Sequence, residues 1–390
     1  MIFAIDCPEP PKVIAAMHLH PVKSCVALAL ALFTLTACTT APAHLPIVPT
    51  HVAAGVSEPI LIATTRASSE DPDIRLTPGR GELSFARADV WVPANRLAGE
   101  ITHPSLPADP TREFALTGYQ ADLAPEAWSA MLDQHLSSMP LAERQVFVFV
   151  HGFNTPFSDG LYLNAQILND FGVRTAAVHY AWPSAGHWPA YLYDRDSAQF
   201  ARDGLVETLE RVSDSPASSI ILLAHSMGSM VTMEALRQLS LEGRADVLSR
   251  LDPVILASPD IDFDVFLNQL DAIDPPPAHL AVLVSDRDRV LALSDSLRGG
   301  HQSCLGIGRQ RDALVERGIA VIDLSELRDG TLLGHVDFAT SETLMQLAAS
   351  GALSEALNGE PGQARESGLG ALADIAARII YLPARALGER

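Results

Sequence analysis

A serine near the middle of the chain has a setting typical of a catalytic nucleophile. Residues 220–223 are four consecutive apolar residues, Ala-His-Ser-Met-Gly follows at 224–228, and residues 229–237 favour a helix. An apolar run without alternation predicts a strand buried on both faces, as in a parallel sheet covered by helices. A strand, an abrupt turn and a helix form a nucleophile elbow, which lifts a serine hydroxyl above the carboxyl edge of the sheet. Ser226 is therefore the predicted nucleophile.

The elbow departs from the usual pattern at one position. The flanking residues of such a turn are very small because strand and helix nearly touch, and Ala224 stands where a glycine is usual. The alanine adds one methyl group at this point. The alternative interpretation is that Ser226 only caps the helix, as serines at helix starts commonly do.

A second turn, upstream of the serine, can stabilise the charge that develops during ester cleavage. Residues 146–150 predict a buried strand, and His-Gly-Phe-Asn follows at 151–154. Fixed backbone N–H groups stabilise an oxyanion, and the loss of one such donor typically costs about 10²–10³ in rate. We expect the N–H groups of Phe153 and Met227 to form this oxyanion hole. The alternative is a plain strand-to-helix turn that requires a glycine.

A serine hydroxyl needs a base, and three histidines follow Ser226 in the sequence. His279 precedes a predicted strand and so lies at the wrong edge of the sheet, and His301 is in a glycine-rich loop. His335 follows the last predicted strand, where the base belongs in chains ordered serine, acid, histidine. We predict His335 as the base, with an exposed loop histidine as the alternative. We predict that His225 packs beside the catalytic residues or supports them from behind, because adjacent side chains on an elbow point in different directions.

The acid that orients this histidine has several candidates. Residues 280–284 predict a strand that runs into Ser-Asp-Arg-Asp-Arg, and Asp288 is preferred over Asp286 there. Asp260 and Asp262 follow the preceding strand and are the reserve. For each carboxylate the alternative is a helix N-cap or a partner of an arginine.

The elements around these residues alternate regularly between strand and helix. Further strands are predicted at 59–63, 83–92, 175–180, 254–256 and 319–322, and helices at 125–136, 161–171, 198–212 and 342–353. This rhythm predicts an α/β fold, a mostly parallel sheet with helices on both faces, whose site lies beyond the carboxyl ends of the strands. The first third is predicted to add strands at one edge of the sheet. Residues 58–355 form the predicted domain, and 356–390 a helical extension.

The N-terminus reads as a targeting segment. A short apolar run ends in Leu-Thr-Ala-Cys. The run is too brief to span a bilayer and is typical of a signal peptide, here predicted over residues 1–37. The four residues resemble a bacterial lipobox, in which the cysteine, here Cys38, is lipidated and begins the mature chain. Residues 38–57 are then a flexible tether. Met17 is a candidate for the true start, because the residues before it lack signal character.

The other cysteines agree with an anchored protein. Cys7 and Cys25 would leave with the signal peptide, so Cys304 would have no intramolecular partner for a disulfide. An acylated Cys38 would anchor the protein to a membrane rather than make it span one. Because Thr39 and not an aspartate follows the cysteine, the resemblance to Gram-negative lipoproteins suggests the periplasmic face of the outer membrane.

Composition excludes one class of partner. The formal net charge is −20 in 390 residues, so nucleic acid is a poor partner. The chain has no metal-ligand motif and no glycine-rich nucleotide loop, so neither a metal nor a cofactor is expected. The expected partners are a small-molecule or lipid ester and the membrane, and the oligomeric state is left open.

Several of these stretches together resemble a bacterial α/β-hydrolase family of largely unknown function, which is esterase- or lipase-like and often found as lipoproteins. The resemblance covers about residues 58 to 350. It rests on Ile-Ala-Thr-Thr-Arg (62–66), Val-His-Gly-Phe-Asn (150–154), Tyr-Ala-Trp-Pro-Ser (180–184), Ala-His-Ser-Met-Gly (224–228), Ser-Pro-Asp-Ile-Asp (258–262), Ser-Asp-Arg-Asp (285–288) and Gly-His (334–335).

The resemblance implies an α/β-hydrolase fold with Ser226, Asp288 and His335 in the triad positions. The expected activity is hydrolysis of carboxylic esters through an acyl-serine. Two alternatives remain open, an envelope acyltransferase or lysophospholipase that uses the same triad, and a non-catalytic lipoprotein scaffold, because fold does not imply function. The resemblance does not determine the substrate.

Overall fold

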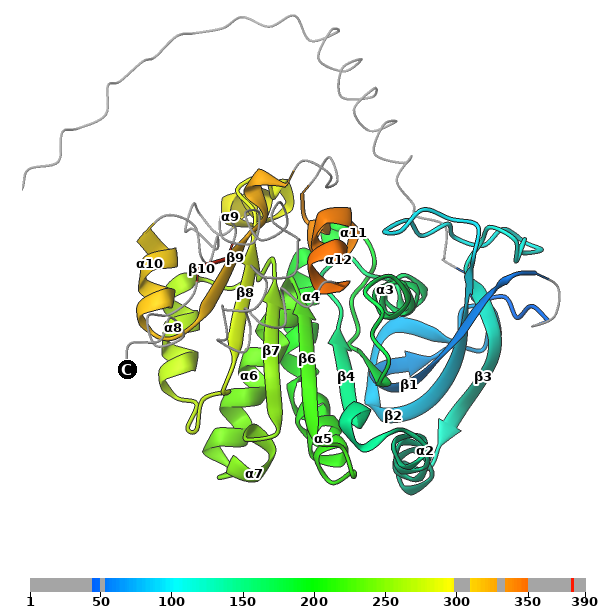
Figure 1. The fold of residues 1–390 in the computed structure, drawn as a ribbon, viewed down its shortest axis with the longest axis horizontal. Coiled ribbons are helices and arrows are strands. Elements are labelled where there is room, and N and C mark those ends of the chain that lie inside the picture. Colours follow the sequence, from blue (N-terminus) through cyan, green and yellow to red (C-terminus); the bar gives the residue numbers. More distant parts are fainter. Residues whose placement is uncertain (1–43, 50–52, 298–308, 328–333, 350–379, 382–390) are drawn as a thin grey trace, which may run out of the picture. The chain divides into compact units, whose positions relative to one another are not determined.

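One sheet of ten strands organises the part of the chain that the structure describes. The computed structural model describes residues 44–49, 53–297, 309–327, 334–349 and 380–381, all within one compact unit, Pro42–Arg390. The strand order is β10-β9-β8-β7-β6-β4-β5-β1-β2-β3 (Figure 1). The strands are β1 (Gly55–Ser68), β2 (Leu76–Pro93), β3 (Ala115–Leu123), β4 (Gln145–Val150), β5 (Ala176–Ala181), β6 (Ser219–His225), β7 (Leu251–Ala257), β8 (Leu280–Val284), β9 (Ala320–Asp323) and β10 (Ile380–Tyr381).

The centre of this sheet is parallel, as predicted. All neighbouring pairs from β9 across to β1 run parallel, whereas β2, β3 and β10 pair antiparallel at the two ends. The first third of the chain therefore adds its strands at one edge, although β3 was not expected. Val150 pairs with Ala224, so β4 and β6 end together. The turns that follow them share one edge of the sheet.

Helices cover both faces of the sheet. The α-helices are α2 (Pro125–Ser138), α3 (Phe157–Asp170), α4 (Tyr191–Phe200), α5 (Arg202–Ser213), α6 (Met227–Leu241), α7 (Ala245–Leu248), α8 (Phe263–Asp271), α9 (Arg289–Leu297), α10 (Arg309–Glu316), α11 (Asp337–Thr340) and α12 (Glu342–Ala349). Short 3-10 turns are η1 (Leu141–Glu143), η2 (Trp188–Ala190) and η3 (Leu324–Glu326).

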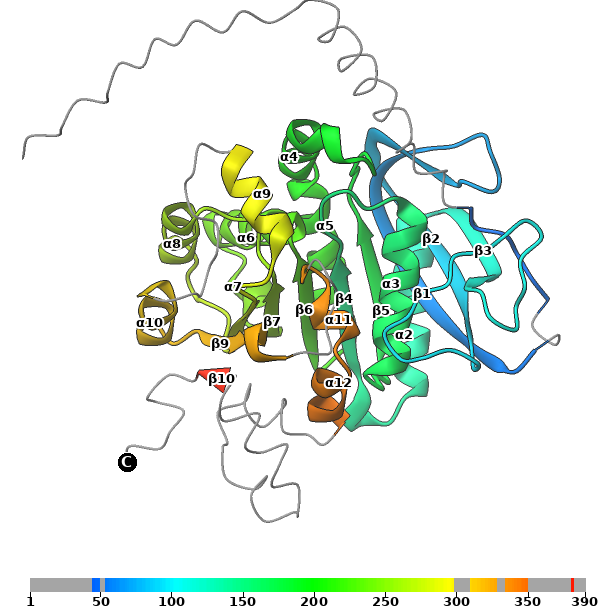
Figure 2. The same cartoon turned by 90° about the horizontal axis from the view of Figure 1, so that it is seen from above.

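Alternation along β4 shows how the two apolar layers arise. Val146, Val148 and Val150 join the cluster that contains apolar residues of α2, α5 and α6, whereas Phe147 and Phe149 join the cluster with α3 and α12. Successive side chains of a strand point to opposite faces, so a continuous apolar strand supplies both layers. Figure 2 shows α5 and α6 on one side of the sheet and α3 and α12 on the other.

Three predicted segments need correction. The helix predicted at 198–212 is two helices, α4 and α5, separated at Ala201. Within the predicted tether, Leu45 and Val48 are buried and the backbone of residues 45–48 bonds to the domain, so this part packs against it. In the predicted C-terminal helix the structure describes only Ile380–Tyr381, which form strand β10 on β9.

The remaining N-terminal and C-terminal predictions lie outside the described residues. These include the signal peptide, Cys38 and most of residues 356–390. No helix in the described part of the chain is long and apolar enough to cross a bilayer.

Candidate active site

The turn between β6 and α6 holds Ser226 in a strained conformation. Its φ is 53° and its ψ is −123°, in a region that non-glycine residues rarely adopt. A Cβ at Gly228 would lie 2.3 Å from the carbonyl oxygen of His151, so only glycine fits there. Ala224 is fully buried in the apolar core, which accommodates the methyl group that departs from the usual glycine. The local geometry is that of a nucleophile elbow.

The turn after β4 packs directly against this serine. A Cβ added to Gly152 would lie 2.9 Å from the Cβ of Ser226 and 2.7 Å from Nδ1 of His225. The turn therefore brings Phe153 beside the serine, and Met227 is the first residue of α6. The first N–H groups of a helix have no acceptor within the helix. Both N–H groups predicted for the oxyanion hole thus lie on turns next to Ser226.

Asp288 and His335 are in direct contact. Nδ1 of His335 lies 2.8 Å from Oδ2 of Asp288, and the two side chains are 11% and 0% exposed. When Nδ1–H donates to the carboxylate, Nε2 carries the lone pair. Nε2 of His335 is buried and has no hydrogen-bond partner among the described residues. An imidazole held in this way can accept a proton at Nε2.

Hydrogen bonds also stabilise the charge on Asp288. Its Oδ1 accepts from the N–H groups of Val290 and Leu291, at 3.1 and 3.0 Å, at the start of α9. Burial acts to raise the pKa of Asp288, but the hydrogen bond and charge of His335 and the bond from Leu291 outweigh it, so the pKa falls below its ordinary value. Asp288 is therefore ionised at neutral pH.

The loops that carry Asp288 and His335 are joined at two further points. Nη2 of Arg287 donates to Oδ2 of the buried Asp337 at 3.1 Å. Gly334 has a φ of 70°, and a Cβ there would lie 2.7 Å from the carbonyl oxygen of Arg287. These contacts hold the histidine loop against the aspartate loop.

The serine and the histidine are linked through His225. Nε2 of His225 donates to the carbonyl oxygen of His335 at 3.1 Å, and the two ring centres are 4.6 Å apart. Burial, then the neighbouring His335, lowers the pKa of His225 to about 3, so it is neutral and supports the loop. Among the described atoms no hydrogen bond joins Ser226 Oγ to His335 Nε2. Such bonds are often long without substrate and tighten in the complex.

The other predicted acids lie elsewhere. Asp286 is exposed, and its backbone N–H donates to Ser325 Oγ at 2.8 Å. Asp262 caps α8 by accepting from Asp264 and Val265, the alternative role considered for it. Asp260 is 4% exposed and lies near Ser226, but it accepts from Tyr191 and Ser294. Asp288 is the candidate that the structure places in hydrogen-bond contact with the His335 ring.

Of the two other histidine candidates, the structure describes His279. Nδ1 of His279 lies 2.6 Å from Asp252 Oδ1, and the His279 carbonyl oxygen, directly before β8 begins, accepts from the N–H of Val254 in β7. This places His279 at the amino edge of the sheet, as expected. His301 lies outside the described residues.

A buried ionic network supports the Gly152 turn, and sequence reasoning assigned it no role. Arg66, 2% exposed, donates to the carbonyl oxygens of Thr155 (2.8 Å) and Ser184 (3.1 Å). The carboxylate of Asp194 accepts from the N–H of Asn154 and of Ala185 and from the hydroxyl of Ser184. The one sequence signal for this network is Arg66 itself, which ends the Ile-Ala-Thr-Thr-Arg stretch that contributes to the family resemblance.

Burial shifts the pKa values of both charged members of this network, Arg66 and Asp194. The pKa of Arg66 falls to about 10 through burial, against the opposing charge of Asp194. Burial raises the pKa of Asp194, and its hydrogen bonds only partly offset that rise. Arg66 stays protonated at neutral pH, so a buried cation holds the loop that carries Phe153.

A small cavity opens beside the nucleophile. Its volume is about 120 Å³, and its lining residues come from the Gly152 turn, η2, α4, the elbow, the loop after β7 and α9. They are Phe153, Trp188, Tyr191, Ser226, Asp260, Val290, Leu291 and Ser294. Within residues 179–200, Trp188 and Tyr191 line the cavity, whereas Tyr180 and Trp182 are fully buried in the core.

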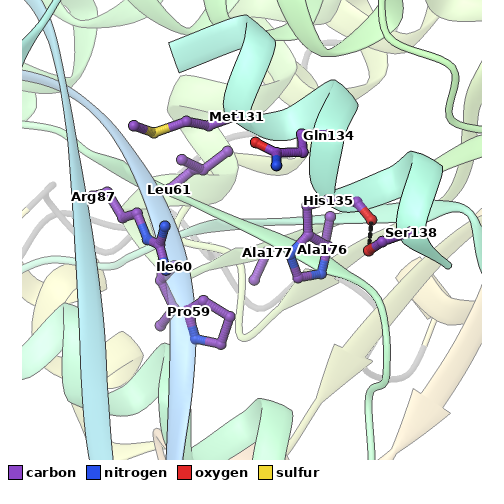
Figure 3. Close-up of a pocket in the computed structure, with 10 residues that line it drawn as sticks. All are labelled: Pro59, Ile60, Leu61, Arg87, Met131, Gln134, His135, Ser138, Ala176 and Ala177. Carbon is purple, nitrogen blue, oxygen red and sulfur yellow. Dashed lines mark hydrogen bonds between the residues drawn. The ribbon is translucent and has the colours of Figure 1, made fainter. Parts of the chain in front are cut away.

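A larger cavity lies at the other edge of the sheet. It has a volume of about 310 Å³ between α2 and the amino ends of β1 and β5. Figure 3 shows Met131, Gln134 and His135 of α2 opposite Ile60 and Arg87 of the sheet. No residue of the Ser226 site lines it. This cavity is therefore not the candidate active site, although it is the larger of the two.

Comparison with known families agrees with this architecture. The model of a family described as alpha/beta hydrolase of unknown function (DUF900) matches residues 124–351, more than half of the chain. No curated protein matches the sequence. The mostly parallel sheet with helices on both faces is the α/β-hydrolase fold that the sequence predicts.

Proposed function

The chain belongs to this family of alpha/beta hydrolases, and from that premise we propose that it is a serine hydrolase that cleaves carboxylic esters. Ser226 is the nucleophile, His335 the general base and Asp288 the residue that orients His335. The observation that carries the proposal is the 2.8 Å contact of His335 Nδ1 with Asp288, which leaves a buried Nε2 without a partner among the described residues.

In the first half-reaction Ser226 Oγ attacks the ester carbonyl carbon while His335 Nε2 takes the hydroxyl proton. The carbonyl π electrons move to oxygen, and the N–H groups of Phe153 and Met227 stabilise the oxyanion. When the oxyanion collapses, the C–O bond to the alcohol breaks and the leaving oxygen takes the proton from His335. The products are a free alcohol and an acyl-serine.

In the second half-reaction water attacks the acyl carbon and gives a proton to His335 Nε2. Collapse of the second oxyanion breaks the bond to Ser226 Oγ, which recovers its proton from His335, and the acid leaves. The ionised Asp288 stabilises the imidazolium in both halves.

The test compares the full-length chain with Ser226→Ala. Wild type is expected to hydrolyse short-chain activated esters and to be labelled by a fluorophosphonate. Ser226→Ala should lose activity by a factor of the order of 10⁶ and should not be labelled. A variant that is still labelled would rule out Ser226 as the nucleophile.

We further propose that lipid on Cys38 anchors the enzyme in the cell envelope. The support is the Leu-Thr-Ala-Cys sequence that ends a short apolar run. Cys38→Ser should release the protein from the membrane fraction, whereas Cys304→Ser, the control, should not. Equal fractionation of both variants would contradict lipidation.

A further inference from the structure

Three aromatic side chains surround the cavity beside Ser226. The ring of Phe153 makes edge contacts with Trp188 and with Tyr191, each with centres 5.4 Å apart and planes at 74°. All three residues line the cavity. Their rings come from the Gly152 turn, from η2 and from the start of α4. Segments far apart in the sequence thus converge on one small space.

A carboxylate completes the wall. Asp260 is 4% exposed and lines the same cavity. Its Oδ1 accepts from Ser294 Oγ at 2.8 Å and its Oδ2 from the Tyr191 hydroxyl at 3.0 Å. Donors aimed at both oxygens stabilise negative charge on a carboxylate. Among the described residues that line the cavity, none is a lysine or an arginine.

Aromatic rings around a negative charge are the chemistry that recognises an ammonium group. A cation within about 6 Å of a ring centre is attracted by the ring quadrupole, and sets of such rings bind quaternary ammonium ligands. The formal net charge of −20 also attracts cations to the surface.

The size of the cavity limits the ligand to a small group. A cavity of about 150 Å³ can hold benzene, and the volume here is about 120 Å³. A trimethylammonium group is of this class, whereas a long acyl chain is not. Because Ser226 is part of the wall, the bound group lies within a few bonds of the reacting carbonyl.

We propose that this cavity binds a small ammonium group. This inference rests on the proposed ester hydrolysis. The substrates are then esters that carry an ammonium group close to the carbonyl, in the alcohol or in the acyl part. Asp260 and the three aromatic residues determine this specificity, while Ser226, His335 and Asp288 perform the chemistry.

The binding test does not depend on catalysis. Choline and its uncharged carbon isostere, 3,3-dimethylbutan-1-ol, are titrated by calorimetry into full-length Ser226→Ala protein. Choline should bind at least about 10-fold more tightly, and Asp260→Asn should abolish the difference. Trp188→Leu tests the rings at a position that is 45% exposed and tolerant of change. Leu192→Ala, 74% exposed on the same helix as Tyr191, is the control.

The kinetic test uses matched esters in the wild type. Choline butyrate is compared with 3,3-dimethylbutyl butyrate, and ethyl 4-(trimethylammonio)butyrate with ethyl 5,5-dimethylhexanoate. The charged member of at least one pair should have a kcat/KM about 10-fold higher, and the favoured pair identifies the charged part of the substrate. Asp260→Asn should remove that preference, whereas the control Leu192→Ala should keep it and leave hydrolysis of the neutral ester within a few-fold.

The outcomes separate the two proposals. Equal binding of choline and its isostere overturns the ammonium site, even where esters are hydrolysed. Hydrolysis of no ester, with selective choline binding that Asp260→Asn abolishes, supports the ammonium site and contradicts ester hydrolysis. A charge preference that survives in both Asp260→Asn and Trp188→Leu overturns the assignment to this cavity.

Discussion

Two cavities in the described part of the domain lie at opposite edges of one sheet, and they differ in the chemistry of the residues that line them. The larger, about 310 Å³, is at the amino ends of β1 and β5, and the smaller, about 120 Å³, is beyond the carboxyl ends of β6 and β7. The larger cavity has more room, but the smaller includes a strained serine and lies at the edge that holds the Asp288–His335 pair. In a parallel sheet the chemistry gathers where the strands end.

Backbone strain marks the same difference. Asn154, Ser226 and Ser258 have φ values of 54°, 53° and 46°, and they follow the carboxyl ends of β4, β6 and β7. No residue lining the larger cavity in the described structure has a positive φ. Such conformations cost about 1–3 kcal/mol each and persist where the surroundings enforce them. Of the five non-glycine residues with a positive φ in the described structure, three thus lie at the edge that carries the candidate site.

The largest effect that tests this comparison is expected at Asp288. Asp288→Asn should lower kcat by about 10⁴-fold, because the amide no longer holds the tautomer of His335 that accepts a proton at Nε2. Steady-state hydrolysis of an activated short-chain ester measures the change. Asp286→Asn is the matched control, an exposed carboxylate two residues away, and should stay within about twofold. Similar losses in both variants would contradict the assignment of the acid.

A smaller effect is expected from two arginines, one for each edge. Arg66 is buried and donates to two carbonyl oxygens near the Gly152 turn, whereas Arg87 is 38% exposed in its side chain and pairs with Asp89 on its own strand. Arg66→Met should lower the free energy of unfolding by about 3 kcal/mol, since buried hydrogen bonds to charged groups are lost. It should also lower kcat by about 10²-fold, because the oxyanion loop shifts.

Arg87→Met should change the free energy of unfolding by less than about 1 kcal/mol, since exposed ion pairs contribute little. Its kcat should not change. Chemical unfolding and ester kinetics measure both properties for each variant. If Arg66→Met fails to fold, Asp194→Asn tests the same loop, because it weakens the acceptor of the Asn154 N–H. Unchanged kcat in a folded Arg66 or Asp194 variant would show that the network does not position the loop.

The sequence predicted the residues of the carboxyl edge better than the network behind them. Ser226, Asp288 and His335 each follow a strand that has a clear apolar pattern, so their shared edge could be inferred from the parallel fold. Their roles as a triad stay a prediction. The 2.8 Å contact between Asp288 and His335 crosses 47 residues, and only the strand order suggested it.

The Arg66 network could not be inferred in the same way. It depends on β1 lying parallel beside β5, with Thr64 opposite Ala181, a pairing that no local pattern indicates. β3 was missed because its pattern is weak: it contains Gly118, and its buried residues are at its start. The break between α4 and α5 was missed because Ala201, a good helix former, occupies it. Tertiary contacts decide such positions.

The smallest expected effect is a difference between the two edges in the sign of a stability change at neutral pH, a difference that fades in acid. Burial raises the pKa of Glu58 above its ordinary 4.5, against the charge of Arg174, and Glu58 precedes Pro59 at the larger cavity. Its ionised form therefore destabilises the folded state at neutral pH, and Glu58→Gln should raise the free energy of unfolding there. The gain should vanish below about pH 4.5, where Glu58 is protonated in both states.

Asp288 should behave in the opposite way. Its folded pKa lies below the ordinary 3.8, so its ionised form stabilises the fold above that pH, and this stabilisation is lost as the pH falls through the folded pKa. Asp288→Asn should therefore lower the free energy of unfolding at neutral pH and have less effect in acid. Urea unfolding of the two variants and the wild type from pH 3 to 7 measures both differences. If both variants change the free energy of unfolding in the same direction at neutral pH, the two edges do not differ in how they stabilise an ionised buried carboxylate.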